Sequence, residues 1–456
     1  METDMTKGKP MGIIVRFFIP MFIGNLFQQI YNIVDSIVVG RFVGNEAFAA
    51  VGSCFLIMSF MTSILIGLAM GASAFFSQLY GAKQYDEMKK AISTSFFFIL
   101  SISILLSLIT NVFLYEIIEL FQMPKDTVTY SAEYLRYILT GLIFTGLYNI
   151  CAYLLRSIGD SKSPLYFLIV SCILNTILDL IFVLVFNMGV SGVGLATFIA
   201  QGLSALWCAL YTVKHMKFLD FKRKDIVFSR KLFKTILSYS VLTAVQQSLS
   251  SFGMLMIQGL INTFGTTVMA AFAACSKIDE FANRPLQDLS NAFSTYVAQN
   301  KGAGNIKRIR QGFHAILKVI ALISFVISIV VFIFAPNLIS IFVKKESIDI
   351  IQVGVGYLRI VCIFYILLGC IVMFYGFFRG MGEVNISIIL TVVSQGIRVA
   401  LAYGLARTSM GFTGICWSIV IGWFLSNALG GFMYKKVMIN AGQLYNTLEG
   451  LFKKTK

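Results

Sequence analysis

Charged residues are scarce in this chain. Lys, Arg, Asp and Glu make up 13% of its 456 residues, and hydrophobic residues make up 57%. A soluble protein of this length would carry about a quarter charged residues. Apolar runs longer than about eighteen residues recur from end to end, and each is long enough to span a bilayer. The shortage of charge therefore excludes a soluble domain and indicates a polytopic membrane protein.

Other absences exclude whole classes of function. No GxxxxGK[ST] motif occurs, so no ATP-hydrolysing module is expected. The eight cysteines all fall in apolar segments without a CxxC pair, so we expect neither disulfides nor a metal centre. No DxxxD motif is present, which speaks against a prenyl transferase that would hold Mg²⁺ between paired acids. We expect no enzyme activity and no cofactor.

The loops divide the chain into twelve predicted helices. Their ranges are 11–39, 47–79, 91–114, 132–155, 164–186, 192–213, 235–262, 267–298, 313–335, 351–378, 384–406 and 412–434. The N-terminus, the C-terminus and the alternate loops between them hold 27 of the 37 Lys and Arg residues, and the opposite loops hold 5. The positive-inside rule therefore predicts that both termini are cytoplasmic, in the inner or plasma membrane. The same distribution argues against a nucleic-acid partner, and no cleavable signal peptide is expected.

The two halves of the chain resemble each other. "VGNEAFAAVGSC" (43–54) aligns with "FGTTVMAAFAAC" (264–275), and "SQLYGAKQYDEMKKA" (77–91) aligns with "AQNKGAGNIKRIRQG" (298–312), both at an offset of 221. A constant offset over such a stretch indicates an internal repeat. We therefore predict an all-α polytopic membrane protein whose two six-helix lobes are related by a pseudo-two-fold axis along the membrane normal. The lobes would cover 1–213 and 235–456, the second with a basic cytoplasmic tail, and a basic cytoplasmic linker would cover 214–234.

Acidic and polar side chains gather in the first half at helical spacing. The segment 11–39 carries a polar stripe that includes Asn25, Gln28, Asn32 and Asp35. Three further residues lie at similar depth on the next segments of this lobe: Asn175, Asp179 and Thr197. Buried acids in membranes are costly, and two of them cannot both ionise cheaply, so the cluster predicts a coupling site for H⁺ or Na⁺. The alternative is that Asp35 is an interfacial residue and Asp179 a helix-packing hydrogen bonder.

The repeat partners of these residues are not acidic. Asp35 corresponds to Met256 at an offset of 221, and Asp179 corresponds to Ala402 at an offset of 223. The ion site is therefore expected in the first lobe alone. Pro20 also has no counterpart in the repeat and could let the first helix bend when Asp35 gains a proton.

A second group of charges lies in "CSKIDEFANRPLQDLS" of the segment 267–298. At helical spacing Glu280 can pair with Lys277 and Arg284, so the group could simply neutralise itself. Asp279 has no basic partner at helical spacing. The second interpretation is that Asp279, together with Glu280 and with Gln246 of the preceding helix, faces a cavity for cationic substrate.

Several motifs together resemble the multidrug and toxic compound extrusion (MATE) family: "VDSIVVGRFVGNEAFAAVG", "RSIGDSKSP", "NTILDLIFV", "GVSGVGLATFIAQ", and the pair "SQLYGA" and "AQNKGA". The likeness covers nearly the whole chain. It implies an antiporter that exports organic cations in exchange for H⁺ or Na⁺, and it implies ion-site roles for Asp35, Asn175, Asp179 and Thr197. Other members place acids on helices 7 and 10, where this chain has none.

The sequence therefore predicts a secondary active multidrug exporter that works by alternating access, with lipophilic organic cations and membrane lipid as its partners, functional as a monomer. The alternative is a flippase of lipid-linked oligosaccharides on the same two-lobe architecture. A flippase for anionic headgroups should line its cavity with basic residues, and Arg136, Arg359 and Arg398 keep that alternative open.

Overall fold

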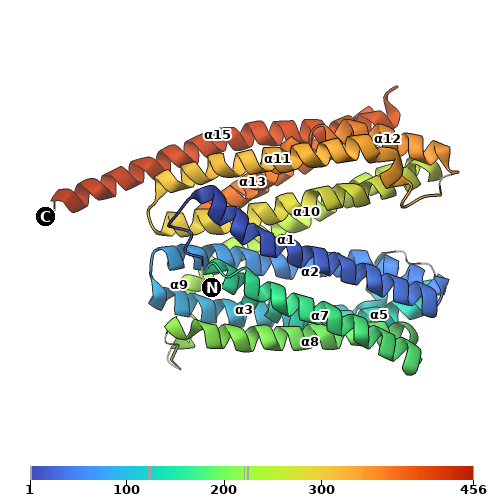
Figure 1. Ribbon diagram of the computed structural model, residues 1–456, viewed down its shortest axis with the longest axis horizontal. Helices are drawn as coiled ribbons and strands as arrows, with labels where there is room; N and C mark the ends of the chain where they lie inside the picture. Colours follow the sequence, from blue (N-terminus) through green and yellow to red (C-terminus); the bar gives the residue numbers. More distant parts are fainter. Residues whose placement is uncertain are drawn as a thin grey trace. The chain divides into compact units, whose positions relative to one another are not determined.

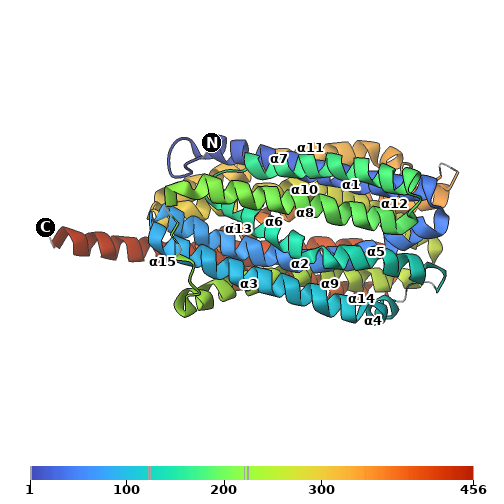
Figure 2. The same ribbon diagram turned by 90° about the horizontal axis from the view of Figure 1, so that it is seen from below.

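The computed structural model describes residues 3–454, apart from 122, 124, 220, 223, 224 and 345. The side chains of Asn32, Asn45, Leu56, Lys125, Lys217, Phe218 and residues 444–454 are also outside the description. Within the described residues all regular structure is helical (Figures 1 and 2). The chain forms two compact units, and each is described by itself. One comprises residues 1–4 and 19–244, and the other comprises residues 5–18 and 245–456.

The first unit contains most of α1 and the helices up to the first half of α9. Their bounds are α1 (Pro10–Phe42), α2 (Asn45–Gly81), α3 (Tyr85–Val112), α4 (Leu114–Leu120), α5 (Val128–Thr140), α6 (Leu142–Ser157), α7 (Lys162–Leu180), α8 (Gly189–His215) and α9 (Arg230–Ile261). A π-helical turn, Ile181–Val185, extends α7, and short 3₁₀ turns lie at Lys125–Thr127 and Met216–Leu219. The helices α7 and α8 lie side by side in both views (Figures 1 and 2).

The second unit contains the remaining helices. Their bounds are α10 (Thr266–Gly302), α11 (Ile306–Ile339), α12 (Ile348–Cys362), α13 (Tyr365–Met381), α14 (Val384–Leu405) and α15 (Gly411–Lys454), with a 3₁₀ turn at Asn262–Phe264. Here α10 packs on α13 and α14 packs on α15. The predicted lobes, 1–213 and 235–456, are meant as the parts that move during transport. The compact units are defined by packing alone, so the lobe boundaries stay a prediction.

Each predicted span overlaps one helix or one bent pair of helices. Eight of the described helices are long and apolar enough to cross a membrane, or ten spans result if each of two bent pairs counts as one. The helices α9 and α10 are not among them, because they carry many serine, glutamine and charged side chains. The chain is therefore an all-α polytopic membrane protein, as predicted.

Two predicted helices are broken rather than continuous. The expected helix 132–155 is the pair α5 and α6, bent by 41°, and the expected helix 351–378 is the pair α12 and α13, bent by 55°. Neighbouring helices satisfy carbonyls near the second break. Ser328 on α11 donates to Cys362 O at 2.5 Å, and Asn427 on α15 donates to Leu367 O at 2.8 Å. Such side-chain donors let a membrane helix break without orphaned backbone groups.

Glycines set how closely the helices approach in each unit. In the first unit, a Cβ on Gly71 of α2 would lie 2.3 Å from Tyr239 O of α9. In the second, Gly376 and Gly380 of α13 form a GxxxG pair, and a Cβ there would lie 2.4 Å from Ser290 O and 2.6 Å from Ser294 O of α10. This spacing is the usual device for close contact between membrane helices.

The N-terminal segment packs with helices encoded far downstream. Met5 N donates to Gln299 Oε1 at 3.1 Å, and Asn300 Nδ2 donates to Met5 O at 3.0 Å. Arg308 donates to Gly8 O at 3.0 Å and to Met5 O at 3.3 Å. These bonds hold residues 5–8 against the adjoining ends of α10 and α11.

Candidate ion-binding site

The four residues predicted to form the coupling site meet inside the first unit. Asp35 comes from α1, Asn175 and Asp179 from α7, and Thr197 from α8. All four side chains are buried, with exposed fractions of 4% or less. Asn175 and Asp179 share a face of α7 because they are four residues apart, and Thr197 lies on α8, which packs against that helix.

Asn175 stands between Asp35 and Thr197. Its amide nitrogen donates to Asp35 Oδ1 at 2.9 Å, and its oxygen accepts from Thr197 Oγ1 and from Thr197 N, each at 3.3 Å. The opposite orientation would place the amide oxygen against a carboxylate oxygen, so Thr197 and Asp35 together fix which end of the amide faces the acid.

The two carboxyl groups adjoin each other, within hydrogen-bonding reach. When both are ionised they can only accept hydrogen bonds. Within the described part of the chain, neither oxygen of Asp179 then has a donor. A buried carboxylate in this state is costly, and one proton or one cation between the two groups removes the cost.

Two tyrosines complete the surroundings of this pair, and the sequence analysis did not find them. The Tyr31 hydroxyl lies within hydrogen-bonding reach of Thr197 and close to both acids. Tyr134 of α5 lies near Tyr31 and both carboxyl groups. Tyr31 precedes Asp35 by four residues on one helix, so its spacing was a usable signal. Tyr134 had no such signal, because only the tertiary packing of α5 brings it here.

The donor atoms of this cluster are all oxygens, supplied by carboxylates, an amide and hydroxyls. Oxygen ligands suit hard cations, and the same carboxyl pair suits a proton. Among the described residues, no group of three or more His, Cys, Asp or Glu side chains could hold a metal ion, so a cation here would depend on the two carboxylates together with the amide and hydroxyl oxygens. The arrangement can therefore bind H⁺ or Na⁺.

The other residues of the predicted polar stripe also lie on α1. Asn25 is partly buried and Gln28 is exposed. Asn32 lies on α1, but its side chain is outside the described residues. Pro20 is buried inside a continuous α1, two residues beyond Phe18, where the chain passes from one compact unit to the other. Its role in bending α1 stays a prediction.

The charge group of α10 divides into two parts. Glu280 accepts from Arg284 at 2.6 Å and lies 3.9 Å from Lys277, the pairs expected from helical spacing. Asp279 has tertiary partners that spacing along its own helix could not reveal. It accepts from Tyr357 of α12 at 2.7 Å and from Tyr365 of α13 at 2.5 Å.

Arg398 of α14 adds a positive charge near Asp279. Asp279 is therefore a compensated carboxylate, unlike Asp179. Gln246, the third residue proposed for a substrate cavity, is buried on α9 with 2% of its surface exposed.

A family model described as MatE matches the chain twice, at residues 20–181 and 242–404. The two matches start 222 residues apart (242 minus 20), between the offsets of 221 and 223 read from the sequence repeat. Together they cover most of the chain. The match therefore supports the internal duplication, independently of the motifs quoted above.

Curated relatives are similar over most of their length. The probable multidrug resistance protein YpnP of Bacillus subtilis is 28% identical over 94% of this chain and 96% of its own. The probable multidrug resistance protein YoeA of the same organism is 26% identical over 86% of both chains. The multidrug export protein MepA of Staphylococcus aureus is 22% identical over 89% of both chains.

Solved structures share the fold. A MATE crystal structure in a bent conformation is 24% identical, with a TM-score of 0.91 over 97% of this chain and 98% of that chain. A MOP superfamily transporter from Pyrococcus furiosus is 24% identical, with a TM-score of 0.90 over 96% of this chain and 98% of that chain. These likenesses establish the architecture.

Proposed function

Because this chain belongs to the MatE family, whose members are transporters rather than enzymes, we propose that it is a secondary active multidrug exporter. It exports organic, mostly cationic lipophilic compounds in exchange for inward H⁺ or Na⁺ by alternating access. The names of the relatives YpnP, YoeA and MepA, which refer to multidrug resistance or export, support this proposal. The two-lobe design and the lack of a nucleotide-binding motif support the secondary mechanism.

One observation carries the choice of coupling site. Asp35 and Asp179 are buried side by side, and the oxygens of Asp179 have no donor among the described residues. A carboxylate in that state attracts a proton or a sodium ion strongly. The second half of the chain has Met256 and Ala402 at the corresponding positions, so ion coupling belongs to the first half alone.

The Asn175 amide supports the site from one side. Its nitrogen donates to Asp35 and stabilises the charge of that carboxylate, while its oxygen accepts from Thr197.

In this proposal the protein lies in the plasma membrane with both termini on the cytoplasmic side. The termini and the loops on their side hold 27 Lys and Arg residues, whereas the opposite loops hold 5. The protein works as a monomer without a cofactor, and H⁺ or Na⁺ is a transported substrate. Its other partners are organic cations and membrane lipid.

The flippase alternative is less favoured by the surroundings of Arg398. This side chain lies near Asp279, whereas a cavity for anionic headgroups needs cations without an acidic neighbour. Arg136 and Arg359 are exposed, and Arg359 lies over the Phe332 ring at 5.5 Å.

The experiment that tests the proposal is export of a fluorescent lipophilic cation from proteoliposomes, with a pH gradient and a Na⁺ gradient imposed separately. For the wild type we expect one of the two gradients to drive export. Asp35→Asn should abolish the gradient-driven component, because an amide cannot exchange a proton and binds sodium weakly. Glu116→Gln, an exposed acid on α4, is the matched control and should export normally.

Two outcomes contradict the proposal at different points. If neither gradient moves the cation in the wild type, drug export is wrong and lipid translocation is to be tested. If Asp35→Asn exports as well as the wild type, the exporter stands but the coupling site lies elsewhere, and Asp279 is the next residue to substitute.

A further inference from the structure

The basic linker that follows α8 lies along the helix α3 within the first unit. Ser229 N donates to Thr94 Oγ1 at 3.1 Å, and Thr94 Oγ1 lies 3.4 Å from Val227 O. Nearer the start of α3, Lys89 lies 3.8 Å from Asp225. The linker therefore follows α3 into a segment that is itself long and apolar enough to cross the membrane.

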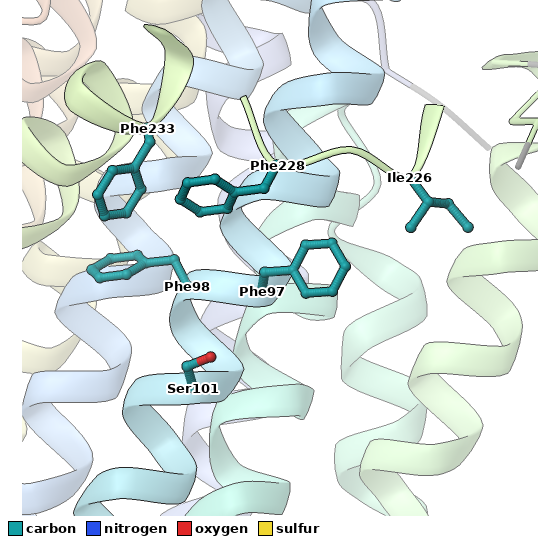
Figure 3. A pocket seen from close by; sticks show the side chains of 6 residues that line it. All are labelled: Phe97, Phe98, Ser101, Ile226, Phe228 and Phe233. Carbon is teal, nitrogen blue, oxygen red and sulfur yellow. The ribbon is translucent and has the colours of Figure 1, made fainter. Parts of the chain in front are cut away.

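An apolar groove opens between α3, the linker and the start of α9 (Figure 3). Its volume is about 520 Å³, within the range of about 300–1,000 Å³ that is usual for small-molecule sites. The lining residues are Phe97, Phe98, Ser101, Ile226, Phe228 and Phe233. Five of the six are apolar, so the groove suits a hydrocarbon chain.

The aromatic wall of the groove is formed before any ligand arrives. The Phe98 and Phe233 rings meet edge to face at 5.4 Å, and the Phe228 ring lies 4.9 Å from Phe233. Phe98 also packs on the hydrophobic core of the unit. Phe97, Ser101, Ile226 and Phe228 remain exposed, so the groove is open at the surface of the unit.

Basic residues flank Phe233, one of the lining residues, along the chain. The segment 214–234 contains eight basic and two acidic residues. Arg230, Lys231 and Lys234, in the first five residues of α9, are all exposed. No acidic residue lies in the first turn of α9, and none of the three forms an ion pair with any residue that the structure describes.

An apolar groove beside exposed cations fits an amphiphile with an anionic head. A lipophilic organic cation, the expected transport substrate, would enter against the positive charge, so this is not a drug site. Basic segments at the membrane surface attract anionic lipids, with about 1 kcal/mol for each Lys or Arg near the surface as the general scale. The apolar walls alone would suit either a lipophilic cation or a lipid. The nearby basic residues favour the anionic lipid.

We propose that the groove between α3 and the linker holds an acyl chain of an anionic phospholipid, with the phosphate bound by Arg230, Lys231 and Lys234. The lipid comes from the leaflet that faces the linker. Its binding fixes the linker against α3 and is separate from the ion site and from the transported substrate.

The test is native mass spectrometry of the full-length protein, purified from mixed micelles that contain equal amounts of phosphatidylglycerol and phosphatidylcholine. The wild type should retain phosphatidylglycerol about tenfold more often than phosphatidylcholine. Ser101→Trp fills the groove from an exposed position and should reduce retention at least fivefold. Leu108→Trp, two turns along the same face of α3 and outside the groove, is the control and should retain the lipid.

A charge series separates the headgroup from the acyl chain. Arg230→Gln/Lys231→Gln/Lys234→Gln should lose the preference for phosphatidylglycerol, whereas Lys435→Gln/Lys436→Gln on α15 should keep it. Thermal unfolding without added lipid checks that the variants are folded. The proposal is overturned if Ser101→Trp retains as much lipid as Leu108→Trp. It is also overturned if wild-type retention does not depend on headgroup charge, or if the groove is covered by a second copy and no lipid is retained.

Discussion

At the scale of single residues, the two acids of the first unit differ in the hydrogen bonds they receive. Asp35 can accept one from Asn175, whereas Asp179 receives none from the described residues. Thr197 supports this arrangement indirectly, because it donates to the Asn175 oxygen and so holds the amide nitrogen toward Asp35. The affinity of the site for its ion should therefore depend on the Thr197 hydroxyl.

Thr197→Val should weaken ion binding while the fold is kept. A buried hydrogen bond to a polar group is worth about 1–1.5 kcal/mol, which corresponds to roughly a tenfold change in affinity. We expect the ion concentration for half-maximal transport to rise about tenfold, measured in proteoliposomes. Thr212→Val, which removes a similar buried hydroxyl farther along α8, should leave it unchanged. Equal effects of the two substitutions would contradict this role.

Asp279 and Arg398 should be coupled in stability. Removing one charge leaves the other buried without full compensation, which is more costly than removing both. Asp279→Asn and Arg398→Met should each lower the apparent Tm in detergent, and the double variant should be more stable than the sum of the two losses predicts. The expected coupling is about 0.5–3 kcal/mol. Strict additivity would mean that the two residues do not interact.

The sequence could place the ion-site residues because depth in a membrane follows from residue number along a helix. Asp35, Asn175 and Thr197 were brought together by that reasoning alone. It could not find Tyr134, nor the tyrosines that bind Asp279, which lie 78 and 86 residues away in the chain. Contacts between distant helices depend on which face each helix turns toward its neighbours. That orientation cannot be predicted from a single sequence.

At the scale of helices, α13 and α10 approach closely in the second unit because Gly376 and Gly380 have no side chains there. Gly376→Ala or Gly380→Ala would place a methyl group on backbone oxygens of α10. Overpacking of this kind costs about 1–3 kcal/mol. We expect a clear loss of thermal stability, read from the fraction that stays monodisperse after heating in detergent.

Glycines on the next helix provide the control for that prediction. A Cβ at Gly396 or Gly404 of α14 would meet nothing within 4 Å. Alanine at either position should leave stability unchanged or raise it slightly, because alanine favours the helix by up to about 1 kcal/mol. If the two pairs of variants behaved alike, close packing of α13 on α10 would not be what these glycines provide.

Helix existence could be predicted from apolar length, but helix breaks could not. The sequence between Cys362 and Tyr365 is as apolar as its surroundings, and its break depends on Ser328 and Asn427 from other helices. The local sequence cannot predict this bend, because the hydrogen-bond donors that stabilise it come from helices distant in the chain. The position of the linker on α3 was missed for the same reason.

At the scale of the whole molecule, the distribution of basic residues predicts that both termini lie in the cytoplasm, and this can be tested. A fluorescent protein fused to the C-terminus should fold and fluoresce, because it would lie in the cytoplasm. Alkaline phosphatase inserted after Thr408, between α14 and α15, should be active, because it would lie outside. The reverse pattern in a bacterial host would contradict the predicted orientation.

The duplication seen at this scale was readable from the sequence, since its offset was nearly constant and the family model matches twice. The chemical difference between the halves was readable too, because Met256 and Ala402 cannot bind an ion as Asp35 and Asp179 can. The division into compact units was not, since the boundaries at Phe18 and Ala244 fall inside the helices α1 and α9.

The hydrogen bonds of the N-terminal segment have a consequence for biosynthesis. Met5 and Gly8 bind side chains at positions 299, 300 and 308, which the ribosome adds about three hundred residues later. At about 5–20 residues per second, these partners appear roughly 15 to 60 s after the segment itself. Most of the first unit can assemble from residues already made, whereas the segment must wait. Its docking is therefore a late event that reports completion of α10 and the start of α11.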